Sequence, residues 1–202
     1  EHTSRGLGDV YKRQTHFSIA DQFGNVISNT YTLNSAYGSG VTISGTGILM
    51  NNEMDDFSGA PGVPNQFNLI GGIANEIVPE KRPLSSMTPT IIFDNGSPLM
   101  AVGSPGGSRI ITTVLQMILN VIDFSMDINE ATSASRIHHQ WYPDRIDIEK
   151  SNINTESLID MGYEINLIDP ATCTQSIYFE DNMFIGSGDL RRPDSLALGV
   201  SK

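Results

Sequence analysis

The sequence predicts an α+β fold in which pairs of strands flank a block of helices. Three features predict it: strand pairs joined by short turns toward both ends of the chain, an amphipathic stretch at 110–119, and a glycine-rich turn at 103–108 leading into that stretch. Each strand pair and each amphipathic helix has an apolar face to bury. These elements are therefore expected to stack in layers around one core.

Length and charge restrict the class of protein. The 202 residues, 39% of them hydrophobic, suffice for one sizeable core, and a formal net charge of -11 would repel a nucleic acid. No apolar run approaches the ~20 residues of a membrane-spanning helix. The single cysteine, Cys173, excludes an internal disulfide. We expect one domain with neither a nucleic-acid partner nor a membrane span.

The sequence predicts a domain boundary near the start of the chain. Residues 1–14 mix charges and glycines without a strand or helix period, so we interpret them as a disordered or foreign N-terminal segment and place the domain at 15–202. Strands at 15–21 and 26–33 follow, joined by turn-forming residues at 22–25. They predict a hairpin that opens the domain.

Two long loops and a second hairpin come next. Glycine, serine, asparagine, aspartate and proline are frequent at 34–47 and 51–67, which predicts loops of a length that tends to be functional. Strands at 90–93 and 99–102 are separated by an Asp-Asn-Gly turn. The second of these strands leads directly into the glycine-rich turn at 103–108.

The C-terminal half predicts two more helices, a strand and a third hairpin. Asp127 followed by Glu130 resembles a capping box and predicts a helix through Ala134, while Asn154 is expected to cap a helix that ends at Gly162. The expected strands lie at 146–148, 175–179 and 183–186.

A threonine and a histidine, Thr15 and His16, stand at the start of the first predicted strand. A threonine at a chain terminus can use its own α-amine, with a pKa of about 8, as the base that activates its hydroxyl for attack on a carbonyl. Any strand can contain threonine, however. An ordinary strand residue is the alternative at this point.

The glycine-rich turn at 103–109 lies between a strand and a helix, where unpaired backbone N–H groups favour negative charge. It lacks the Lys-Ser/Thr ending of a phosphate-binding P-loop and the spacing of a dinucleotide fingerprint. An oxyanion site is therefore favoured over a nucleotide site. A purely structural glycine turn stays open as the alternative.

Polar residues gather in two of the expected loops, at 51–56 and 83–87. Carboxylates in the first suit an ammonium group, and serine hydroxyls in the second suit a carboxylate, although both sets could simply be solvated. The pair His138-His139 has no further ligand at metal-binding spacing, and neighbouring strand residues point to opposite faces. We expect neither a metal nor a cofactor.

Together, these segments resemble one family, the γ-glutamyltranspeptidases. The matching stretches are THFSIAD, GNVISNTYTLN, GILMNNEMDDFS, PGVPN, KRPLSSMTPTI, VGSPGGSRIITTVLQMILNVID, HHQW and GDLRRPD, and the resemblance covers essentially residues 15 to 194. It implies an αββα four-layer sandwich of the N-terminal-nucleophile hydrolase type, with half contributed by this chain. It also implies a precursor that cuts itself, so that the new N-terminal threonine becomes the nucleophile.

The resemblance assigns roles to individual residues. Thr32 matches the threonine that hydrogen-bonds the nucleophile, and Gly106 and Gly107 match the glycines of the oxyanion hole. The residues that match the substrate-binding set comprise three for the α-amino group and two for the α-carboxylate: Asn34, Glu53 and Asp56, then Ser85 and Ser86.

One position departs from the family pattern. The motif at the cleavage point has two threonines before the histidine, whereas this sequence has Gln14 and Thr15. Thr15 matches the second threonine, which follows the nucleophile by one residue. Gln14 therefore stands where the nucleophile belongs. Because side chains alternate along a strand, Thr15 could replace it only through a one-residue slip. As written, the chain is expected neither to process itself nor to form the acyl-enzyme.

For the parent enzyme, the resemblance implies γ-glutamyltransferase and glutathione hydrolase activity. The partners it implies are the large subunit of the same precursor, glutathione or another γ-glutamyl compound, and an acceptor amino acid or peptide, in the periplasm or outside the cell. Two alternatives stay open. One is a related acylase for cephalosporins or poly-γ-glutamate, and the other is a non-catalytic half that lacks the nucleophile.

Overall fold

The computed structural model describes residues 14–150, 153–181 and 183–200. The N-terminal part holds β1 (Thr15–Ala20), β2 (Val26–Tyr31) and the two 3-10 turns η2 (Glu53–Asp56) and η3 (Ile73–Asn75). The elements that follow are β3 (Thr90–Asp94), β4 (Ser97–Gly103), α1 (Arg109–Ile122), α2 (Ile128–Ser133), β5 (Ile137–His138), β6 (Ile146–Glu149), α3 (Glu156–Asp160), β7 (Ile165–Ile168), β8 (Gln175–Glu180) and β9 (Met183–Gly188).

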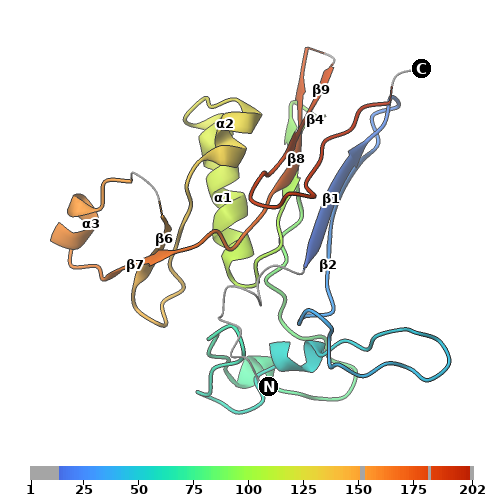
Figure 1. Ribbon diagram of the computed structural model, residues 1–202, viewed down its shortest axis with the longest axis vertical. Helices are drawn as coiled ribbons and strands as arrows, with labels where there is room; N and C mark the ends of the chain where they lie inside the picture. The colour runs from blue at the N-terminus through green and yellow to red at the C-terminus, as the bar shows by residue number, and fades with distance from the viewer. Residues whose placement is uncertain (1–13, 151–152, 182, 201–202) are drawn as a thin grey trace.

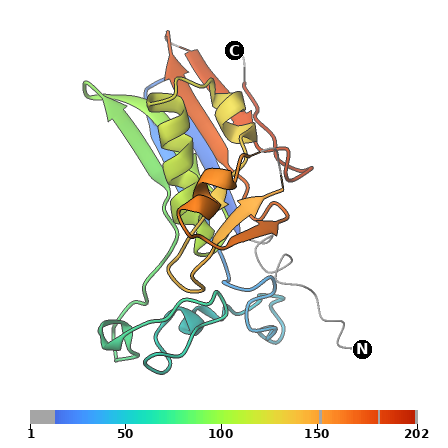
Figure 2. The ribbon, with the colours of Figure 1, turned by 90° about the vertical axis from the view of Figure 1, so that its left-hand side faces the viewer.

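The strands form three sheets. A four-stranded antiparallel sheet has the order β3-β4-β8-β9, the β1-β2 hairpin lies against it, and β5-β6-β7 form a smaller mixed sheet. Helices α1 and α2 lie on the side of the four-stranded sheet opposite the hairpin (Figures 1 and 2). The predicted α+β class is confirmed, with one helical layer followed by two layers of strands.

Hydroxyl groups join the two strand layers. Ser28 of β2 donates to the backbone oxygen of Val102 at 3.0 Å, and Ser18 of β1 donates to that of Gln175 at 3.1 Å. His16 lies against Gly103, where an added Cβ would come within 2.2 Å of the imidazole Cε1. Glycine at this position therefore allows β1 to approach β4 closely.

The core lies between the four-stranded sheet and the helices. Every third or fourth residue of α1 faces the sheet, as expected for an amphipathic helix. Burying such side chains stabilises the fold by roughly 1.5–3 kcal/mol each. The buried cluster contains Met100, Val102, Ile110, Val114, Met117, Val121, Ile128 and Ala131.

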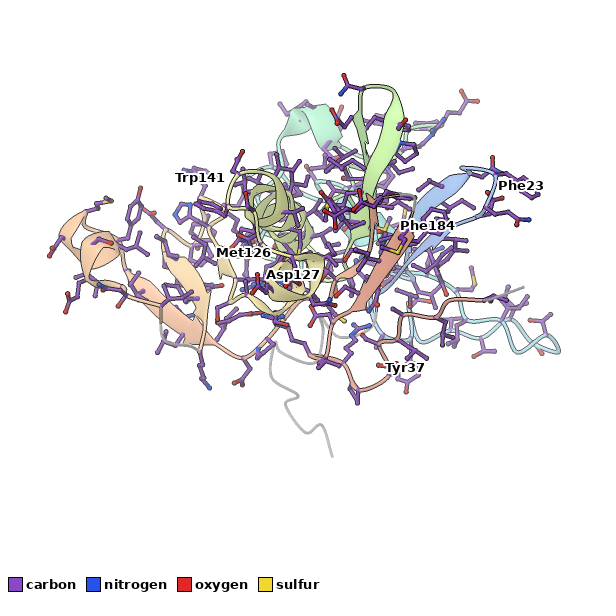
Figure 3. The ribbon with its side chains drawn as sticks, turned by 90° about the horizontal axis from the view of Figure 1, so that it is seen from above. Phe23, Tyr37, Met126, Asp127, Trp141 and Phe184 are labelled. Atoms are coloured by element: carbon purple, nitrogen blue, oxygen red, sulfur yellow. The ribbon has the colours of Figure 1, made fainter. Side chains whose placement is uncertain are left out.

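Local sequence patterns correctly predicted most of the helices and strands. All three predicted hairpins are present, and Asp127 begins α2 through a capping box, accepting from the backbone N–H of Asn129 at 2.8 Å and of Glu130 at 2.9 Å (Figure 3). The helix expected after Asn154 is shorter than predicted and spans only Glu156–Asp160, with Thr155 at its N-cap. The carboxamide oxygen of Asn154 still accepts from the N–H of Glu156 at 2.9 Å.

Strand β7 was not predicted, and the strand assumed for His138 and His139 includes only His138, in β5. β7 pairs in parallel with β6, and β5 is only two residues long. Such pairing depends on a distant strand rather than on a turn next to it in sequence. In β6 the carboxylates Asp147 and Glu149 are buried, because Arg109 and Arg145 pair with the first and Arg191 with the second.

Buried ion pairs also fix the segment that follows β9. Asp189, 1% exposed, accepts from Arg136 at 2.7 Å, and Arg191 donates to Glu149 at 2.7 Å. Pairing of this kind compensates charges that would be costly to bury alone. Within residues 14–150, 153–181 and 183–200, no helix has the length and apolar character to cross a membrane.

Candidate active site

The glycine turn predicted between strand and helix connects β4 to α1. Gly106 has φ of +144° and Gly107 has φ of +57°, so both adopt backbone conformations that favour glycine. Their N–H groups both donate to the side-chain oxygen Oε1 of Gln14, at 2.8 Å and 2.9 Å. The turn therefore directs two backbone N–H donors at a single carbonyl oxygen.

Gln14 and Thr15 differ sharply in their surroundings. Gln14 precedes β1 and is 7% exposed, with its carboxamide in the glycine turn. Thr15 is exposed and pairs with Tyr31 across the hairpin. The side chain that faces the turn is thus that of position 14, and the catalytic role considered for Thr15 stays a prediction. The domain boundary between 14 and 15 also stays a prediction, since residues 1–13 lie outside the described ranges.

The buried side chain of His16 connects β1 to β2. Its Nδ1 lies 2.7 Å from the hydroxyl of Thr30, and its Nε2 lies 3.2 Å from that of Ser18. Burial lowers the pKa of His16 to about 4, so the imidazole is neutral at physiological pH. The sequence placed His16 beside the position predicted for the nucleophile but did not indicate this contact with Thr30.

A small cavity opens in front of the glycine turn. Figure 1 shows the loops between β2 and β3 gathered at the end of the molecule where β1 and α1 begin. The cavity is lined by the residue before β1, by residues of these loops and by the glycine turn: Gln14, Thr32, Asn34, Asp56, Phe67, Ser85, Ser86, Met87 and Gly107.

Amide side chains hold the loops around this cavity. Asn34, 3% exposed and with φ of +72°, donates from its backbone N–H to the hydroxyl of Thr32 at 2.8 Å and from its side chain to the backbone oxygen of Asn52 at 3.2 Å. Asn75 donates to the backbone oxygen of Asp56 at 2.7 Å and accepts from the N–H of Leu84 at 2.9 Å. The acidic turn η2 is thereby connected to both neighbouring loops.

Two carboxyl groups of η2 influence each other. Burial, and to a lesser extent the nearby Asp56, raises the pKa of Glu53 to about 7. The pKa of Asp56 is also raised, chiefly by burial. A pair of this kind holds a proton when empty and favours a cation in its place.

The structure brings most of the predicted site residues together. The predicted site residues that line this cavity are Thr32, Asn34, Asp56, Ser85, Ser86 and Gly107. Gly106 shares the Gln14 oxygen with Gly107, whereas Glu53 lies in the same turn as Asp56 but outside the lining. Their roles toward a substrate stay predictions.

Two apolar residues of the lining, Phe67 and Met87, were not singled out in the sequence. Met87 directly follows the Ser85-Ser86 pair, and Phe67 ends the second predicted loop, so their neighbours were the available signal. Among the described residues, no group of three or more His, Cys, Asp or Glu side chains is arranged to hold a metal ion.

This arrangement can be compared with known proteins. The family model for γ-glutamyltranspeptidase matches residues 9–199. The chain belongs to the γ-glutamyltranspeptidase family. It is 48% identical over 188 residues to the glutathione hydrolase proenzyme of Escherichia coli K12, covering 92% of this chain and 32% of that protein. With the glutathione hydrolase proenzyme of Pseudomonas aeruginosa it shares 53% identity over 129 residues, or 64% of this chain and 23% of that protein.

Solved structures agree with this family assignment. A γ-glutamyltranspeptidase mutant from Helicobacter pylori is 51% identical and superposes with a TM-score of 0.85, covering 88% of this chain and all (100%) of that one. A cephalosporin acylase from Bacillus halodurans, at 23% identity and a TM-score of 0.79 over 92% of this chain and 34% of that one, shares the fold. The chain spans about a third of the length of the E. coli proenzyme.

Proposed function

We propose that this chain carries the γ-glutamyl pocket of a two-part γ-glutamyltransferase and glutathione hydrolase. The observation that carries the proposal is the Gln14 carboxamide in the glycine turn, its oxygen 2.8 Å and 2.9 Å from the N–H groups of Gly106 and Gly107. A γ-glutamyl amide presents the same group. Such donors stabilise the negative charge that develops on a carbonyl oxygen during attack.

The other end of the substrate would be held by the loops. In this proposal the carboxyl groups of Glu53 and Asp56, with the side chain of Asn34, bind the α-ammonium group, and the hydroxyls of Ser85 and Ser86 bind the α-carboxylate. An ammonium pocket favours free γ-glutamyl compounds such as glutathione over acyl groups without an amine. This favours the γ-glutamyl reaction over the related acylase alternative.

The reaction requires threonine at position 14. Its hydroxyl, oriented by Thr32, would attack the γ-carbonyl carbon while its α-amine takes the hydroxyl proton. The amide C–N bond breaks, the leaving amine takes up that proton, and a γ-glutamyl ester forms. Water, or the amine of an acceptor amino acid or peptide, then displaces the threonine oxygen. With Gln14 in place the pocket is expected to bind a ligand without this turnover.

The larger part of the precursor is the proposed partner, with the periplasm or the exterior of the cell as the proposed compartment. Relatives named as proenzymes are about three times as long as the part matched here, which supports the partner. The outer face of the β1-β2 hairpin exposes Phe17, Ile19, Ile27 and Tyr31, an apolar surface that a further layer would cover.

The test uses the complete protein, in which this chain is produced together with the larger part of its precursor. A chain that begins at position 14 with Gln14→Thr is expected to hydrolyse a chromogenic γ-glutamyl anilide. In that background Thr32→Ala and Asp56→Ala should each lower kcat/KM by at least about tenfold. An unchanged kcat/KM in both variants would remove the site assignment. Binding of glutamate without any turnover would instead support the non-catalytic alternative.

A further inference from the structure

Arg192 contacts the reacting position from the opposite end of the chain. Its Nη1 donates to the backbone carbonyl oxygen of Gln14 at 3.0 Å, across 178 residues of sequence. It is absent from the set of residues that line the cavity. Its contact with the site is therefore made through residue 14.

The segment that carries Arg192 is held on both sides. Its backbone N–H donates to the carbonyl of Asp189 at 3.1 Å, closing a turn. The Asp189 side chain is paired with Arg136 at 2.7 Å, and Arg191 donates to Glu149 at 2.7 Å. Because Arg136 lies just before β5 and Glu149 lies in β6, these pairs fix the turn that carries the Arg192 side chain.

Residue 14 needs such an anchor because the strand ladder does not hold it. The first register pair of the hairpin is Thr15 with Tyr31, so residue 14 lies just outside the ladder. The glycine turn contacts its side chain and Arg192 contacts its carbonyl. Fixing the carbonyl sets the plane of the peptide bond between residues 14 and 15, and with it the position of the Cα atom from which the side chain at 14 extends.

We propose that Arg192 is a positioning residue that orients residue 14 toward the Gly106-Gly107 turn. The inference rests on the proposed function, because its catalytic consequence requires threonine at position 14. Loss of the guanidinium would let the first residue rotate away from the attacking geometry. Since Arg192 does not line the cavity, substrate binding would be preserved while the reaction slows.

The experiment compares Arg192→Met and Arg192→Lys in the complete protein with Gln14→Thr. Misplacing a reacting group by about 1 Å can cost on the order of 100-fold in rate. For Arg192→Met we expect kcat to fall by about 10- to 100-fold with KM within about twofold. Arg192→Lys should recover part of kcat, since an ammonium can still donate to the carbonyl. The control is Lys150→Met, which removes an exposed cation paired with Asp169.

A second readout does not depend on turnover. Amide hydrogen exchange of the peptide covering 14–20 should be faster in Arg192→Met than in the parent and unchanged in Lys150→Met. If the Gln14→Thr parent is inactive, the proposed function fails, and the exchange measurement still decides the role of Arg192. If the parent is active and Arg192→Met changes neither kcat nor exchange, the positioning role is overturned. A rise in KM with kcat unchanged would also overturn it.

Discussion

The side-chain oxygen of Gln14 accepts a hydrogen bond of 2.8 Å from the backbone N–H of Gly106. The N–H of Gly107 donates to the same oxygen at 2.9 Å. In the proposed site, the residue at the expected nucleophile position thus occupies, with its own carboxamide, the donors that a substrate carbonyl would use.

Removing the Gln14 carboxamide should free the glycine turn for a ligand. In the complete protein, Gln14→Ala is expected to bind L-glutamine about tenfold more tightly, because two N–H groups become available, each contributing roughly 0.5–1.5 kcal/mol. Calorimetric titration measures the change. Norvaline, which lacks the γ-carbonyl, serves as the control ligand and should gain nothing. Equal gains for both ligands would contradict the role of the turn.

Gly106→Ala should remove catalysis with little loss of substrate binding. An added Cβ would come within 2.5 Å of Thr172 Cγ2, and φ of +144° is unfavourable for alanine, so the N–H is expected to turn away. Losing one oxyanion donor costs about 100- to 1000-fold in kcat. Steady-state kinetics in the Gln14→Thr protein provide the measurement. Gly199→Ala, where the added Cβ meets nothing within 4 Å, is the matched control and should keep full activity.

Ligand affinity should rise with pH through the titration of Glu53. Its pKa is raised to about 7 in the folded protein, from 4.5, so the carboxyl becomes charged only as the pH passes neutrality. The charged form attracts the ammonium group, and the Kd for glutathione in the Gln14 protein should therefore fall between about pH 6 and pH 8. Glu53→Gln should flatten this profile. A profile that persists in Glu53→Gln would assign the titration to another group.

The same shift predicts the opposite trend for stability. A carboxyl whose pKa is higher in the folded than in the unfolded state binds more protons when folded, so its contribution declines as the pH rises from 4.5 toward 7. In thermal melts without ligand, Glu53→Gln should lose this decline. An identical dependence of Tm on pH in parent and variant would exclude Glu53 as the source of the decline.

Arg136→Ala is expected to destabilise the fold severely. Arg136 donates to Asp189, and both side chains are buried, so the variant would leave a carboxylate with 1% exposure to the charge of Arg191 alone. Breaking a buried pair on one side costs about 3–5 kcal/mol. Lys150→Ala, which breaks an exposed pair, should cost only about 0–1 kcal/mol. Denaturant unfolding of the complete protein measures both, and equal losses would contradict the role of burial.

Short-range signals in the sequence determined much of this protein. Turn residues between alternating strands predicted all three hairpins, and Asp127 with Glu130 predicted the start of α2, because each signal acts within a few residues. The glycine turn and the two polar loops were also identifiable as candidate site segments. That all three segments contribute to the lining of the same cavity is a property of the tertiary structure.

Only the tertiary structure decided what depends on distant residues. The parallel pairing of β7 with β6, the neutral state of buried His16 and the contact of Arg192 with residue 14 all join segments that no local pattern relates. The same holds for the Gln14 side chain, which lay in a segment without any periodicity yet fills the glycine turn. Local propensity acts over a few residues, whereas burial and hydrogen-bond partners are set by the packing of the whole chain.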